Sequence, residues 1–239
     1  MGSLADQVYR AVAGLVGSDL LEITLLSLTV SGLATAISLL VGLPLGTWLA
    51  LSRFRSRGLV LTGVNTGMAL PPVVAGLVVA FLLWRSGPLG DLGLMYTPAA
   101  MVIAEAIIAT PIIVGLTVAA LGQLDPRLRL QLLGLGASEW QMIRWLWREA
   151  RLPLLAALMA GFGSVISEVG AAMMVGGNIA HQTRVLTTAI VLQVSRGDFT
   201  SAIALGIVLR PVWLDVVGSQ NEHVVKANHV IQNSSGIPL

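Results

Sequence analysis

Four long stretches of the chain are almost free of charged side chains. They cover residues 23–52, 58–84, 92–124 and 152–183, and the last two each hold one acidic residue, Glu105 and Glu168. A transmembrane helix needs about 20 apolar residues, so each stretch is long enough for one crossing. A fifth stretch is weaker because Arg210, Pro211 and Asp215 interrupt it. The pattern predicts an all-α polytopic membrane protein with about five transmembrane helices. The predicted spans are 23–52, 58–84, 96–121, 152–175 and 199–217.

The composition supports a membrane protein and excludes several other classes. Only 11% of the 239 residues are charged, against about 25% in a soluble domain, and the mean hydropathy is +0.84. A net charge of +2 is too small for a nucleic-acid-binding surface. The chain has no cysteine, so we expect no disulfide, no thiol nucleophile and no thiolate metal site, and its three histidines are too scattered for a metal site. We assign no catalytic residue.

The arginines predict how the chain is oriented in the membrane. Residues 53–57 and 122–151 together contain eight arginines, whereas the segments on the opposite side contain four. Because cytoplasmic loops carry an excess of basic residues, these two segments are predicted to face the cytoplasm and the N-terminus to face outward.

Residues 122–151 do not have the composition of a loop. Asp125-Pro126 is a typical helix start, and Gly134 and Gly136 are a typical helix stop. A second start follows at Ser138, with Gln141 three residues later as in a capping box. The segment therefore predicts two short helices with an apolar and a cationic side. Such a pair could lie on acidic lipid headgroups or could dock into a cytoplasmic partner protein.

The same segment resembles a known signature. Leu-Gln-Leu-Leu-Gly-Leu-Gly-Ala-Ser over 130–138, followed by Leu152-Pro153, is similar to the coupling-helix signature of permease subunits of binding-protein-dependent ABC importers. The signature begins Glu-Ala-Ala, has an obligatory Gly six residues after the Glu, and ends near Leu-Pro. Gly136 and Ala137 match it, whereas Leu130 replaces the Glu and Gln131 and Leu132 replace the two Ala residues.

Further stretches resemble the tungstate/molybdate-type oxyanion branch of that family. They are 65–76, 86–90, 168–179 and 183–190, and the resemblance covers roughly residues 20 to 209. It implies a type I permease fold and import of an oxyanion across the inner membrane of a prokaryote. Tungstate is the oxyanion that the resemblance favours. It also implies a permease homodimer, two cytoplasmic ATPase subunits that bind ATP and Mg²⁺, and a periplasmic or extracellular substrate-binding protein. The coupling residues it implies are Leu130, Gln131, Gly134, Gly136, Ala137, Trp140 and Arg144.

Residues within or near the spans are candidates for a translocation path or gate: Pro71, Pro72, Glu168, Gly170, Met173, Met174 and Asn178. Pro71-Pro72 breaks a helix, which is compatible with a kinked pore helix or with a packing kink. Glu168 is a poor ligand for an oxyanion because like charges repel. A gate role and a structural bond to the amide or hydroxyl of a neighbouring helix, or to an arginine, both remain open. Arg184 is expected to attract anions at the outer face.

Three observations bear on other kinds of function. The only lysine, Lys226, has none of the flanking residues of a phosphate-binding P-loop, so any ATP hydrolysis is expected in another chain. A secondary transporter or channel is an alternative, but it predicts internal repeats that are not evident. An intramembrane serine protease is a remote alternative, since Ser164 is followed by Val165 and His181 lies beyond the span.

The end of the chain differs from the rest. Residues 210–239 contain the sole lysine, two of the three histidines and a polar tail. We expect a permease domain over 1–209 and an atypical C-terminal tail over 210–239 that is exposed and poorly packed.

Overall fold

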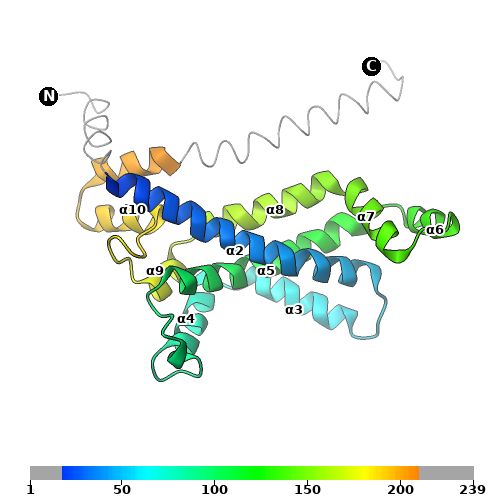
Figure 1. Cartoon of the computed structure of the whole chain (residues 1–239), viewed down its shortest axis with the longest axis horizontal. Coiled ribbons are helices and arrows are strands. Elements are labelled where there is room, and N and C mark those ends of the chain that lie inside the picture. The colour runs from blue at the N-terminus through cyan, green and yellow to red at the C-terminus, as the bar shows by residue number, and fades with distance from the viewer. Residues whose placement is uncertain (1–17, 210–239) are drawn as a thin grey trace, which may run out of the picture.

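The computed structural model of the chain describes residues 18–209, which are helical and contain no strand (Figure 1). The helices are α2 (Ser18–Leu51), α3 (Arg57–Ala69), α4 (Pro72–Leu83), the 3-10 turn η1 (Gly90–Leu92), α5 (Pro98–Gly122), α6 (Pro126–Gly134), α7 (Glu139–Glu149), α8 (Arg151–Ile166), α9 (Gly170–Gly176), α10 (Leu186–Ser195) and a last helix, Phe199–Leu209. The expected all-α fold is confirmed. The tail 210–239 and the part of the fifth predicted span beyond Leu209 lie outside the described residues.

Three helices, α2, α5 and α8, run side by side along the long axis of the molecule (Figure 1). Among the described residues, α2 and α5 are each long and apolar enough to cross a membrane alone. The helices α6 and α7 lie at one end of this body, and α9, α10 and Phe199–Leu209 lie at the other (Figure 1).

Small residues allow α2 and α5 to approach closely. A Cβ added at Gly42 would be 2.9 Å from Ile113 Cγ2, and one added at Gly46 would be 2.6 Å from Thr117 Cβ. About one turn before Gly42 in α2, Ser38 donates a hydrogen bond to the carbonyl oxygen of Ala106 at 3.0 Å. Small residues and cross-helix hydrogen bonds are what hold helices together in a membrane, where burial of apolar surface gives little driving force. These contacts make α2 and α5 one packed unit.

The range predicted as a single span over 58–84 contains two helices, α3 and α4, which meet at 97°. The bend has a local cause in Pro71 and Pro72. A residue before proline is pushed out of the helical region, and Leu70 and Pro71 both precede a proline. Their ψ angles are 126° and 128°, which is extended backbone. Two consecutive residues therefore leave the helix, and α4 restarts with Pro72 at its first position, where a missing amide costs nothing.

The range predicted as a span over 152–175 is also interrupted. The helix α8 ends at Ile166, and α9 begins at Gly170. On its other side α8 meets α7 at 75°, across the single residue Ala150. The helix α9 packs against α4, so the two broken regions of the chain lie against each other.

Candidate functional site

The helix pair expected within 122–151 is present, and its first helix begins as predicted. The Oδ1 of Asp125 accepts a hydrogen bond from the Arg127 amide at 2.8 Å, and Pro126 occupies the first position of α6. The carboxylate satisfies an amide that has no partner within the helix. The start of α6 is therefore encoded locally by two adjacent residues.

The end of α6 is a glycine-dependent turn. The Gly136 amide donates to the carbonyl of Leu133 at 3.0 Å, and the Ala137 amide donates to the carbonyl of Leu132 at 3.1 Å. These two bonds form a Schellman motif, which places Gly136 in the left-handed region with φ at +83°. The predicted helix stop is confirmed, and Gly136 is the glycine whose conformation the turn requires.

The second helix, α7, begins with the capping box that the sequence predicts. The Ser138 amide donates to Gln141 Oε1 at 2.9 Å, and the Gln141 amide donates to Ser138 Oγ at 3.3 Å. A reciprocal pair of this kind satisfies two amides at once. We call α6, the turn 135–138 and α7 together the elbow. Its turn is short and hydrogen-bonded on both sides, so the backbone path between α6 and α7 is well defined.

One face of α7 joins the elbow to the long helices. Met142, Leu146 and Ala150 are buried there and pack with Leu121 at the end of α5. On the adjacent face, the indole Nε1 of Trp147 donates to Thr47 Oγ1 of α2 at 2.9 Å. The elbow is therefore attached to the membrane domain by apolar packing and by a polar contact.

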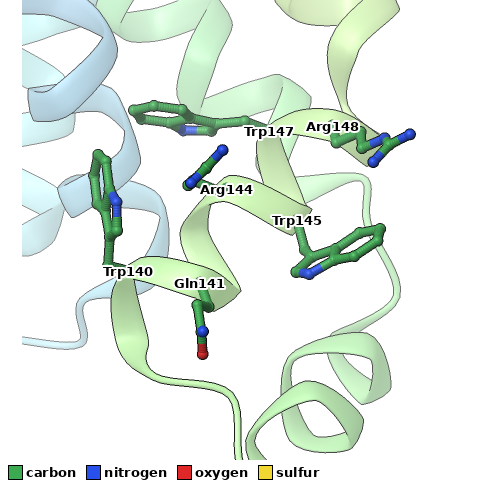
Figure 2. A pocket seen from close by; sticks show the side chains of 6 residues that line it. All are labelled: Trp140, Gln141, Arg144, Trp145, Trp147 and Arg148. Atoms are coloured by element: carbon green, nitrogen blue, oxygen red, sulfur yellow. The ribbon is translucent and has the colours of Figure 1, made fainter.

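The other faces of α7 carry tryptophan and arginine (Figure 2). Trp140, Arg144 and Trp147 lie on one side of the helix, and Trp145 and Arg148 lie on the other. The Trp140 and Trp147 rings meet edge to face at 5.9 Å, and the Arg148 guanidinium lies 5.3 Å from the Trp145 ring centre. An open hollow of about 570 Å³ lies here, and its lining residues are Trp140, Gln141, Arg144, Trp145, Trp147 and Arg148.

The elbow exposes large apolar side chains. Leu130 is 69% exposed, Leu135 is 85% exposed and Trp140 is 60% exposed. Exposed apolar groups that cluster on a projecting element mark a surface that another molecule covers. The sequence-predicted coupling residues Gln131, Gly134 and Arg144 are exposed on the same elbow, and Ala137 is half-buried in its turn.

Some of the predicted gate residues meet where α4 packs against α9. A Cβ added at Gly76 of α4 would be 2.6 Å from the Ala171 Cα, and one added at Gly170 would be 2.4 Å from Val73 Cγ2. Pro72 begins α4 beside this contact, and Pro71 forms the bend that leads into it. Met173 and Met174 lie on α9 and are exposed on the single chain.

Glu168 has a structural partner. Its Oε1 accepts a hydrogen bond from the Ala171 amide at 3.0 Å, at the start of α9, and its backbone carbonyl accepts one from Thr187 Oγ1 at 2.9 Å. A carboxylate at a helix N-terminus is favourable because the amides there carry partial positive charge. The carboxylate bond is local, three residues along the chain, and is not the expected bond to a neighbouring helix or to an arginine.

At the other end of the molecule, Asn178 and Arg184 form one unit. Arg184 Nε donates to Asn178 Oδ1 at 3.2 Å, and Asn178 Nδ2 donates to the carbonyl of Thr188 at 3.3 Å. Asn178 itself is in the left-handed region, with φ at +53°. Arg184 also borders a small hollow that contains Glu22 and His181, whose Oε2 and Nδ1 atoms are 3.0 Å apart.

Glu105 lies inside the helix body. It is 2% exposed, and its Oε2 accepts a hydrogen bond from Ser31 Oγ of α2 at 3.2 Å. The hydrogen bond joins α2 and α5 of the same chain, so Glu105 has a partner without a second permease copy. Across residues 18–209 no group of three acidic or histidine side chains is arranged to hold a metal ion.

Sequence reasoning missed the contacts that attach the elbow to α2. Besides Trp147 and Thr47, Arg129 Nη1 of α6 donates to the carbonyl of Leu51 at 3.0 Å. The residues in these two contacts are 100 and 78 positions apart, so no local pattern predicts them. Close packing at Gly76, in contrast, has a local signal, because a small residue in an apolar span favours close helix packing.

Long apolar helices joined by small residues, with the elbow exposed at one end, define an integral membrane protein. The chain belongs to the family described as binding-protein-dependent transport system inner membrane component, which matches residues 42–214. It is thus a multi-pass permease subunit of an ABC transporter, in which a separate subunit is the ATPase.

Relatives match the chain over most of its length. It is 41% identical over 211 residues to the tungstate uptake system permease protein TupB of Peptoclostridium acidaminophilum, covering 87% of this chain and 92% of that protein. It is 39% identical over 202 residues to a probable anion ABC transporter permease protein of Haloferax volcanii, covering 82% and 87%. The inward-facing MetNI methionine ABC transporter shares its fold, with a TM-score of 0.67 and 17% identity over 87% of this chain and 95% of that one.

Proposed function

We propose that this chain is the permease of an ATP-driven importer of a tetrahedral oxyanion, and that the oxyanion is tungstate. The observation that carries the proposal is the identity to relatives named for tungstate and for anions, which extends over most of their length. Three relatives named for molybdenum transport are 29%, 25% and 29% identical, lower than the tungstate relative at 41%, which favours tungstate within the oxyanions.

The elbow is the surface on which the ATPase subunit docks. Leu130, Leu135 and Trp140 supply exposed apolar contact, and the Gly136 turn presents them rigidly. Gln131, Gly134, Ala137 and Arg144 border the same surface. The arginine distribution supports a cytoplasmic elbow and an outer N-terminus. ATP and Mg²⁺ are bound and used in the partner, and two ATPase subunits serve a permease homodimer.

The oxyanion passes along the side of the α4–α9 contact that a second permease copy completes. Met173 and Met174 of α9, the bend at Pro71-Pro72, and Gly170 lie on this element pair. Glu168 fixes the start of α9 through the Ala171 amide and acts on the gate through that helix. An acidic side chain that is already hydrogen-bonded to an amide does not need to meet the anion.

At the outer face, Arg184 attracts the anion as the substrate-binding protein releases it. Its bond to Asn178 holds the guanidinium beside the turn that follows α9. Arg184 borders the same small hollow as Glu22 and His181, which contact each other. The guanidinium therefore supplies positive charge to a hollow that also contains a carboxylate.

Uptake into proteoliposomes tests the proposed substrate. The permease is reconstituted with its ATPase and its binding protein, and tungsten accumulation is measured by elemental mass spectrometry with molybdate or sulfate as competitor. We expect tungstate to accumulate and excess molybdate or sulfate to compete weakly. Accumulation of sulfate in preference to tungstate would contradict the proposed substrate.

Copurification tests the docking surface. Gly136→Trp places a bulky side chain on the elbow and is expected to abolish capture of the ATPase subunit. Gly197→Trp is the matched control, because Gly197 also has a positive φ, +77°, and open space around an added Cβ, but lies beyond α10. Equal capture by the two variants would show that the elbow is not the docking surface.

A further inference from the structure

Two polar contacts join the elbow to the last turns of α2. One comes from α6, where Arg129 Nη1 donates to the carbonyl of Leu51 at 3.0 Å. The other comes from α7, where Trp147 Nε1 donates to Thr47 Oγ1 at 2.9 Å. The contacts come from the two different helices of the elbow and reach α2 four residues apart, about one turn. Two separate points of attachment restrict rotation of the elbow about either one.

The Trp147 contact is specific in its geometry. Thr47 is 4% exposed, and its hydroxyl donates to the carbonyl of Leu43 at 2.7 Å. Its hydrogen is thereby used, and its lone pairs remain to accept from Trp147. An indole N–H can only donate, so donor and acceptor are matched in one orientation.

The Arg129 contact satisfies the end of a helix. The last carbonyls of a helix have no partner within it and carry partial negative charge, which favours a cationic side chain. Arg57 Nε donates to the carbonyl of Leu49 at 2.8 Å, and Arg129 does the same for Leu51. Two of the arginines in the cytoplasmic segments therefore bind the end of α2.

A movement of α2 is also a movement of α5. At Gly46 the backbone of α2 approaches Thr117 and the carbonyl of Val114 so closely that an added Cβ would lie 2.6 to 2.9 Å from them. Close-packed helices of this kind shift as rigid elements rather than deform. A displacement of the elbow that is carried to Thr47 and Leu51 therefore moves both long helices.

We propose that Trp147 and Arg129 are positioning residues that hold the elbow and α2 together throughout the transport cycle, so that movement of the ATPase reaches α2 and α5 directly. The inference rests on the proposed docking of the ATPase at the elbow. Each of the two residues bonds to α2 of its own chain, so its loss is expected to lower the amount of substrate moved per ATP while the ATPase stays bound.

The first test measures oxyanion molecules imported per ATP hydrolysed in the reconstituted transporter. Trp147→Phe removes the N–H together with the pyrrole part of the indole, Thr47→Val replaces the hydroxyl with a methyl group of similar size, and Arg129→Gln removes the cation. Arg127→Gln is the control on the same helix. Each of the first three variants is expected to lower the ratio about fivefold. One hydrogen bond contributes a net free energy of about 1 kcal/mol, which corresponds to about a fivefold change in an equilibrium constant. The double variant Trp147→Phe with Thr47→Val is expected to fall no further than either single variant.

A second test uses the absence of cysteine from the chain. The double variant Thr47→Cys with Trp147→Cys loses the contact, and a short bifunctional thiol reagent restores a link between the same two positions. We expect a low ratio before linking and a ratio near that of the wild type after linking. Normal coupling before linking, or no transport after linking, would overturn the inference.

These outcomes separate the inference from the function on which it rests. If the wild-type complex does not bind the ATPase or import the oxyanion, the proposed function fails. If the wild type does both and Trp147→Phe, Thr47→Val and Arg129→Gln couple as well as Arg127→Gln, the positioning role alone fails. ATPase binding measured for every variant shows whether a loss arises from docking.

Discussion

Replacing Gly136 by alanine changes the elbow at a single backbone position. The residue has φ at +83°, and no atom lies within 4 Å of the Cβ that alanine would add. The cost is therefore conformational and contains no steric clash. A left-handed conformation costs a residue with a Cβ roughly 1–2 kcal/mol relative to glycine. The Schellman turn between α6 and α7 is destabilised by that amount.

Gly134→Ala is the matched control. Gly134 is the last residue of α6, and an added Cβ there also meets nothing within 4 Å. Alanine at a helical position is more stable than glycine by about 0.5–1 kcal/mol. The two variants should therefore differ by about 2 kcal/mol in the stability of the turn, which is about 30-fold in its opening equilibrium.

Hydrogen exchange followed by mass spectrometry measures this opening in the full permease held in nanodiscs. Peptides covering 130–142 should exchange faster in Gly136→Ala and as slowly as wild type, or more slowly, in Gly134→Ala. Binding of the ATPase subunit should weaken in Gly136→Ala by no more than the same factor. Equal exchange in the two variants would show that the left-handed glycine does not hold the elbow together.

Three further predictions concern the helix body and the outer face. Gly46→Ala is expected to lower the thermal unfolding midpoint, because overpacking costs about 1–3 kcal/mol, whereas Gly32→Ala on the same helix meets no atom within 4 Å and should not lower it; equal midpoints would refute the close α2–α5 packing. Glu105→Gln keeps an oxygen that accepts from Ser31 and should unfold near the wild-type temperature, whereas Glu105→Ala should lose about 1–3 kcal/mol through the unpaired hydroxyl; a Gln variant as unstable as the Ala variant would contradict this. Arg184→Lys should retain most of the uptake that Arg184→Gln loses, because charge attracts the anion; equal losses would indicate that the fork onto Asn178 matters instead.

The elbow could be predicted almost completely from the sequence because its determinants are local. Asp125, Ser138 and Gln141 each bond an amide two or three residues away, and Gly136 adopts a conformation that its own lack of a Cβ permits. Charge-free stretches likewise locate the long helices, since a membrane crossing requires a fixed length of apolar residues.

Geometry that depends on distant residues could not be predicted in the same way. Pro71-Pro72 signals a break, but the 97° between α3 and α4 depends on two successive extended residues and on what α4 meets. In the sequence, Thr47 is one of many small polar residues in an apolar helix. Its role as the acceptor for Trp147 is evident only from the structure. Glu168 is an intermediate case, because its partner amide is only three residues away, yet its place in a span left a gate role and a structural role both open.

The most direct test of the account is tungstate uptake into proteoliposomes that contain the permease, its ATPase and its binding protein, with either ATP or a non-hydrolysable analogue enclosed. The account predicts accumulation against a gradient with ATP, none with the analogue, and none with ATP when the permease carries Gly136→Trp. Accumulation that is equal with ATP and with the analogue would contradict an ATP-driven permease and would indicate a channel or secondary transporter.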